Sequence, residues 1–178
     1  MSVNDKKAYI DEQIDWISLV LKENKPFWCI CLGAQMLARN LRGCVCTRND
    51  ETVEVGWYPL EAATSQGKAL MNWPEIVYHF HDECIYDLPQ ETMLLTTGHT
   101  YPTQAFRYGH NAWGLQFHIE FTRAMMRRLV VRSTQKLTEK GAQPASVHLK
   151  GRLIYDQALS QWFENALQQI FCVSTACV

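Results

Sequence analysis

The sequence predicts an α/β fold in which helices flank a largely parallel sheet. Residues 26–30 form a short apolar run without polar alternation, which is typical of a strand covered on both faces, as in a parallel sheet. Helical periodicity precedes this run, because Ile10, Ile14, Ile17 and Leu21 share one helix face. A second helical pattern follows the run at once, and this alternation of helix and strand indicates the α/β class.

The remaining elements follow from the same patterns in chain order. The first helix begins near Asn4, a capping residue, and stops at residues 24–26. The second helix ends before Gly43, which provides a C-terminal cap. Further apolar runs predict strands at 53–57, 76–80, 93–97, 104–108 and 112–117. Helices are expected again at 122–138 and, after a break at 141–146, around residues 155–170.

Length and composition predict a single folded domain over residues 1–178. Hydrophobic residues make up 47% of the chain and charged residues 20%, as in ordinary globular proteins. The net charge of -1 lacks the basic signature of a nucleic-acid-binding protein, so no nucleic-acid partner is expected.

The sequence also predicts a cytoplasmic protein with no membrane partner. The longest nearly apolar run, residues 26–38, is too short for a membrane helix, which needs about 20 apolar residues. The N-terminus has neither a secretory signal nor the glycine that myristoylation requires. Seven cysteines without an export signal indicate reduced thiols rather than a disulfide framework.

The first chemical signal is a cysteine at a tight turn from strand to helix. Cys31 occupies the apex of this turn, and the small residues Cys29 and Gly33 stand two positions to either side. Such an elbow exposes the apical side chain beside the free N–H groups of the helix, which favours a nucleophilic thiolate. The alternative from this segment alone is a buried structural cysteine.

A thiolate nucleophile also needs a proton carrier from a distant part of the chain. His118 stands at the end of a predicted strand, and Glu120, two residues on, lies on the same side. A carboxylate in that position accepts the second ring N–H and holds the imidazole in one tautomer. Taken alone, a histidine at a strand end is more often structural than catalytic, so His118 carries this prediction only together with Cys31 and Glu120.

Four motifs at residues 29–35, 54–57, 104–109 and 114–120 together resemble those of the class I (triad) glutamine amidotransferases. The pattern is most similar to stand-alone members that resemble the amidotransferase domain of GMP synthase. This resemblance implies that Cys31 is the nucleophile, His118 the acid and base, and Glu120 the orienting carboxylate. It further implies an oxyanion and substrate-binding set consisting of Leu32, Gly33, Gln35 and His81.

The resemblance carries expectations for fold and partners. It implies a flavodoxin-like three-layer α/β/α fold with a mainly parallel sheet. Residues 1–5 resemble the segment that follows a Gly-Gly-Pro turn in relatives, so the first strands and one oxyanion donor are expected to be missing. The implied substrate is L-glutamine, with no cofactor and no metal. The implied partner is a separate ammonia-accepting synthetase subunit or a second copy of the chain.

Three alternatives stay open from the sequence. A structural zinc site could use the pairs Cys29/Cys31, Cys44/Cys46 and His79/His81, although zinc pairs normally have wider spacing. The chain could instead be a catalytically inactive remnant that serves as a binding module. It could also be a thiol hydrolase of γ-glutamyl peptides on the same scaffold.

Overall fold

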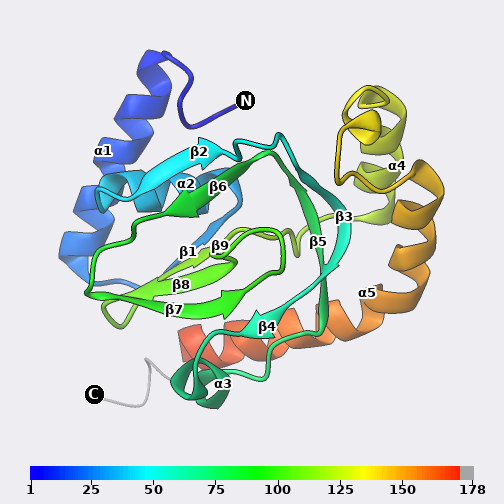
Figure 1. Ribbon diagram of the computed structural model, residues 1–178. Helices are drawn as coiled ribbons and strands as arrows, with labels where there is room; N and C mark the ends of the chain where they lie inside the picture. The colour runs from blue at the N-terminus through cyan, green and yellow to red at the C-terminus, as the bar shows by residue number, and fades with distance from the viewer. Residues whose placement is uncertain (173–178) are drawn as a thin grey trace.

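The computed structural model describes residues 1–172 (Figure 1). Its helices are α1 (Ala8–Glu23), α2 (Leu32–Asn40), α3 (Ser65–Leu70), α4 (Arg123–Arg132) and α5 (Ala145–Leu167). A 3-10 turn, η1 (Lys136–Thr138), and a π turn, η2 (Gln168–Cys172), follow the last two helices. The strands are β1 (Phe27–Ile30), β2 (Cys44–Thr47), β3 (Glu54–Pro59), β4 (Glu61–Ala62), β5 (Ile76–His81), β6 (Glu83–Tyr86), β7 (Thr92–Thr97), β8 (Ala105–Tyr108) and β9 (Ala112–Leu115).

The main sheet has five strands in the order β1-β9-β8-β7-β4, and its pairing is mixed. The α/β class is confirmed, but the expectation of a mainly parallel sheet is wrong for the described residues, where β1 and β9 alone pair in parallel. The physical reason is the connections: short links join β7, β8 and β9 in sequence, and short links allow antiparallel pairing only. Parallel pairing of β1 with β9 uses the long chain between them.

Helices cover both faces of the main sheet, so the predicted three-layer arrangement is confirmed. Side chains alternate between two cores: Trp28 and Ala105 face one, whereas Cys29 and Phe106 face the other. The first core packs under α4 and α5, and the second packs under α1 and α2 (Figure 1). This alternation follows from the two-residue period of a strand.

Two antiparallel ribbons, β2–β6 and β3–β5, complete the fold beside the main sheet. The β3–β5 ribbon pairs Glu54 with His81, so these two polar residues are neighbours across strands. A bridge between Tyr78 of β5 and His118 joins this ribbon to the segment that follows β9. Residues predicted to carry chemistry therefore converge where β1, β5 and β9 end.

No helix within residues 1–172 combines the length and the apolar character that crossing a bilayer requires.

Candidate active site

Cys31 lies at a strained turn between β1 and α2. Its backbone has φ 47° and ψ -107°, a conformation that costs a residue other than glycine about 1–3 kcal/mol. The Cys31 N–H donates to the carbonyl of Leu115 at 2.7 Å, which fixes the turn against β9. Because such strain persists where a structure needs it, the elbow geometry agrees with a functional thiol.

The two neighbouring small residues have the positions expected of them. Cys29 is buried, and burial raises its pKa to about 12, so it is a neutral thiol near pH 7. A Cβ built on Gly33 would lie 3.6 Å from the Cβ of Cys29, an ordinary contact. The turn therefore has room for an alanine at position 33, so a glycine is not strictly required there.

The N-terminus of α2 presents free donors beside Cys31. Within the described chain, the N–H groups of Leu32 and Gly33 have no hydrogen-bond acceptor, as is usual in the first turn of a helix. The positive end of the helix dipole adds to their attraction for negative charge. Both groups can bind an oxyanion that forms on a carbonyl attacked by Cys31.

His118 joins Cys31 to Glu120. The His118 N–H donates to the carbonyl of Tyr78 at 2.8 Å, and the Nδ1 atom lies 2.6 Å from Glu120 Oε1. Since an ionised carboxylate only accepts, Nδ1 carries a proton. Cys31 interacts with the same imidazole and helps to raise its pKa. The N–H of Ile119 donates to Glu120 Oε2 at 3.0 Å and holds the carboxylate in place.

Charges at the site favour a protonated imidazole. Burial lowers the pKa of His118, but the hydrogen bonds with Cys31 and Glu120 outweigh it and raise the pKa to about 9. Burial raises the pKa of Glu120, whereas the hydrogen bond from His118 lowers it, and the net shift is downward. His118 is therefore cationic near pH 7, between a carboxylate and the thiol.

Residues 2–134 match the family model described as glutamine amidotransferase class-I. This match covers well over half of the sequence and includes Cys31, His118 and Glu120. The chain belongs to the class-I glutamine amidotransferase family. The family predicted from the four sequence motifs is thereby confirmed.

Individual relatives agree with this assignment. The chain is 29% identical over 114 residues to YfeJ from Salmonella typhimurium, which is named as a glutamine amidotransferase-like protein. That alignment covers 62% of this chain and 46% of YfeJ, so the chain spans about half the length of this curated relative. A solved glutamine amidotransferase from Thermotoga maritima is 28% identical, with a TM-score of 0.81 over 96% of this chain and 74% of that one.

A second solved structure shows the fold alone. It is described as a GMP synthase subunit from Thermoplasma acidophilum and is 23% identical. Its TM-score is 0.55, over 71% of this chain and 69% of that one.

The other two predicted side chains, those of Gln35 and His81, both contact the backbone carbonyl of Glu83. Gln35 is buried in α2, and its Nε2 lies 3.3 Å from the carbonyl of Glu83. His81 Nδ1 lies 3.0 Å from the same carbonyl, and His81 Nε2 lies 2.9 Å from His79 Nδ1. The protein thus occupies both ring nitrogens of His81, and neither is free for direct contact with a substrate.

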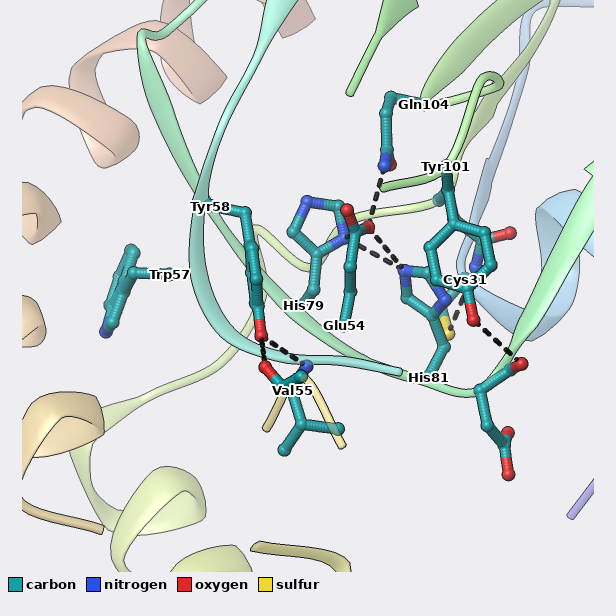
Figure 2. A network of polar contacts seen from close by, with 12 residues as sticks. Cys31, Glu54, Val55, Trp57, Tyr58, His79, His81, Tyr101 and Gln104 are labelled. Atoms are coloured by element: carbon teal, nitrogen blue, oxygen red, sulfur yellow. Dashed lines mark hydrogen bonds and ion pairs between the residues drawn. The ribbon is translucent and has the colours of Figure 1, made fainter. Parts of the chain in front are cut away.

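Among the described residues, one group of three could hold a metal ion, and it contains no cysteine. Possible ligand atoms of Glu54, His79 and His81 lie within 4.8 Å of one another. Hydrogen bonds account for this cluster: His79 pairs with His81, and Gln104 Nε2 donates to Glu54 Oε2 at 2.7 Å (Figure 2). Of the three pairs considered for a zinc site, only His79/His81 belongs to this group, so within residues 1–172 the cysteine pairs do not join it.

The pKa shifts of His79 and Glu54 agree with a hydrogen-bonded cluster of a neutral imidazole and a carboxylate. Burial lowers the pKa of His79 to about 3, so its ring is neutral. Burial raises the pKa of Glu54, but its polar contacts, which include the hydrogen bond from Gln104, outweigh burial, and the net shift is downward. The cluster therefore contains a buried carboxylate that hydrogen bonds stabilise.

Sequence analysis missed one residue beside the thiol. Gln116 is buried, and its Nε2 lies 3.9 Å from the sulfur of Cys31. The sequence could have indicated this residue: Gln116 precedes His118 by two positions, and residues two apart on an extended segment point to the same side.

Proposed function

We propose that this amidotransferase hydrolyses the side-chain amide of L-glutamine to glutamate and ammonia. The observation that carries the proposal is the strained elbow that holds Cys31 against His118, while Glu120 contacts the far side of the imidazole. A nucleophile, a base and an orienting group in this order are the machinery of acyl transfer through a covalent intermediate.

The first half of the reaction forms a thioester. The Cys31 thiolate, paired with protonated His118, attacks the carboxamide carbon and forms a C–S bond, while the electron pair of the C=O π bond moves to the oxygen and makes it an oxyanion. The free N–H groups of Leu32 and Gly33 at the start of α2 support their role in binding this oxyanion. Collapse of the tetrahedral intermediate breaks the C–N bond, and His118 gives its proton to the departing ammonia.

The second half of the reaction releases glutamate. Neutral His118 takes a proton from a water molecule, whose oxygen attacks the thioester carbon. Breaking the C–S bond yields glutamate and returns the sulfur to Cys31, and His118 is again protonated. Glu120 stays ionised throughout and stabilises the imidazolium, as the lowered pKa of its carboxyl group requires.

The proposed route for the ammonia is transfer to a separate synthetase subunit. The support is the resemblance of the motifs at residues 29–35 and 114–120 to amidotransferase domains of the GMP synthase kind. The same triad could cleave γ-glutamyl peptides, because their amide carbon has the same chemistry as that of glutamine.

A paired assay tests the proposal. Release of ammonia and glutamate from L-glutamine is measured beside cleavage of a γ-glutamyl peptide. Wild type, Cys31→Ala and the control Cys44→Ala, which changes an exposed thiol on β2, are compared. We expect glutamine hydrolysis that Cys31→Ala abolishes and Cys44→Ala preserves. Peptide cleavage alone would support the peptidase, and a folded protein without either activity would support a binding module.

A further inference from the structure

A series of hydrogen-bonded groups leads from the backbone of Glu83, at the start of β6, through the side-chain amides of Gln35 and Gln116 to the nucleophile. The carbonyl of Glu83 receives Gln35 Nε2 at 3.3 Å, and the same Nε2 lies 3.4 Å from Gln116 Oε1. Gln116 Nε2 in turn lies 3.9 Å from the Cys31 sulfur. Gln35 and Gln116 are both buried, so water does not compete strongly for these contacts.

The Glu83 carbonyl determines which end of each side-chain amide donates and which accepts. A backbone carbonyl can only accept, so Gln35 must turn its NH₂ group toward Glu83. That NH₂ group then donates to Gln116, which must therefore present its oxygen to Gln35. The remaining end of the Gln116 amide, its NH₂ group, is directed at Cys31.

We propose that Gln116 is a positioning residue that directs an N–H donor at the sulfur of the nucleophile. The Glu83 carbonyl sets this orientation through Gln35. A donor at this place stabilises negative charge on the sulfur and restricts its direction of attack. The proposal rests on the proposed function only in naming Cys31 as the nucleophile.

The backbone around Gln116 is suited to this role. Its N–H donates to the carbonyl of Gln104 at 2.8 Å, and the preceding carbonyl, of Leu115, accepts from Cys31 N–H. Two backbone hydrogen bonds at neighbouring residues, Leu115 and Gln116, therefore fix the Cys31 turn and the segment that carries the Gln116 side chain. His81 Nδ1 also donates to the Glu83 carbonyl, and His81 in turn contacts His79. This buried cluster therefore helps to fix the carbonyl that orients Gln35.

The test measures the rate at which iodoacetamide alkylates Cys31 as a function of pH. Peptide mass spectrometry follows Cys31 in a background with exposed Cys44 and Cys46 changed to serine. Gln116→Glu keeps the length of the side chain but replaces its donor with an oxygen, and Gln116→Met keeps the bulk without a donor. Gln157→Glu, on the exposed surface of α5, is the matched control.

We expect the half-maximal pH of alkylation to rise by about one unit in both Gln116 variants, the size that a hydrogen bond to a charged group supplies. The control should keep the wild-type profile. Overlapping profiles in a folded Gln116→Glu or Gln116→Met protein would overturn the proposal. In unmodified protein, the side-chain amide signal of Gln116 in a ¹H–¹⁵N spectrum should move when Cys31 is alkylated, and an unmoved signal would also overturn it.

The two proposals can fail separately. A shifted alkylation profile without glutamine hydrolysis would support Gln116 as a positioning residue and contradict the proposed function. Glutamine hydrolysis with an unchanged profile would support the function and contradict the role of Gln116.

Discussion

In the proposed reaction, His118 and Glu120 have different tasks in proton transfer. His118 interacts with Cys31 and would carry the proton, whereas the hydrogen bonds of the Glu120 carboxylate within residues 1–172 go to the imidazole and to the N–H of Ile119. Removal of either residue therefore has a different consequence.

We expect His118→Ala to lower kcat for glutamine hydrolysis by about 10²–10⁴, the usual effect of losing a general acid and base. Glu120→Ala should cost at least about tenfold less, because the imidazole remains beside Cys31 in a looser orientation. Steady-state kinetics of the two variants measures the difference. Equal losses would show that the carboxylate is as necessary as the proton carrier.

The raised pKa of His118 predicts a pH-dependent contribution to stability. The ordinary value of 6.5 applies to the unfolded chain and about 9 to the folded one, so the folded state binds the proton more tightly. The resulting stabilisation is complete below pH 6.5 and disappears as the pH rises through about 9. Urea unfolding of wild type and His118→Asn should therefore differ most at low pH and converge above pH 9. A constant difference would contradict the assignment.

Residue chemistry was predictable where it depended on local geometry. The tight turn at Cys31 could be predicted from a strand passing directly into a helix, and the contact between Glu120 and His118 from their spacing of two residues. The role of His81 could not be judged in this way, because its ring nitrogens are occupied by His79 and by the carbonyl of Glu83, each two residues away in the sequence. These contacts depend on the bend between β5 and β6, which residue types and spacing alone do not predict.

At the scale of elements, long periodic segments were predictable and short edge strands were not. The predicted helix at 122–138 ends at Arg132, and Lys136 instead pairs with Asp82 at 2.7 Å. This tertiary contact draws the segment toward β5 and β6. Strand β2 escaped prediction because it buries only Val45, so its sequence has no strand signature.

The loop before α5 is held on β3 at a position where only glycine fits. Gly56 has φ 138°, and a Cβ there would lie 2.3 Å from the Gln143 side chain. That side chain accepts from Trp57 N–H at 2.8 Å and donates to its carbonyl at 2.6 Å. Both strain and clash thus oppose any side chain at position 56.

Gly56→Ala should lower the free energy of unfolding by about 2–4 kcal/mol. Gly109→Ala is the matched control, because Gly109 also has a positive φ but its added Cβ would meet nothing within 4 Å. This control should cost only about 1 kcal/mol. Urea unfolding measures both, and similar losses would show that the contact with Gln143 adds little.

At the scale of the whole molecule, the three layers bring together residues from distant parts of the chain. Cys31 comes from the turn after β1, and His118 from the segment after β9, its parallel neighbour. The α/β class was predictable because helical patterns alternate with short apolar runs along the sequence. The mixture of parallel and antiparallel pairs was not predictable, because the direction of each pair depends on which strands become neighbours and how they are connected.

The central claim is that Cys31 reacts with the side-chain carbonyl of glutamine. The most direct test is covalent labelling by a chloroketone analogue of glutamine, followed by peptide mass spectrometry. The account predicts one adduct, on Cys31, whose formation excess L-glutamine slows and Cys31→Ala abolishes. Preferential labelling of buried Cys29, or labelling that glutamine does not slow in a folded protein, would contradict it.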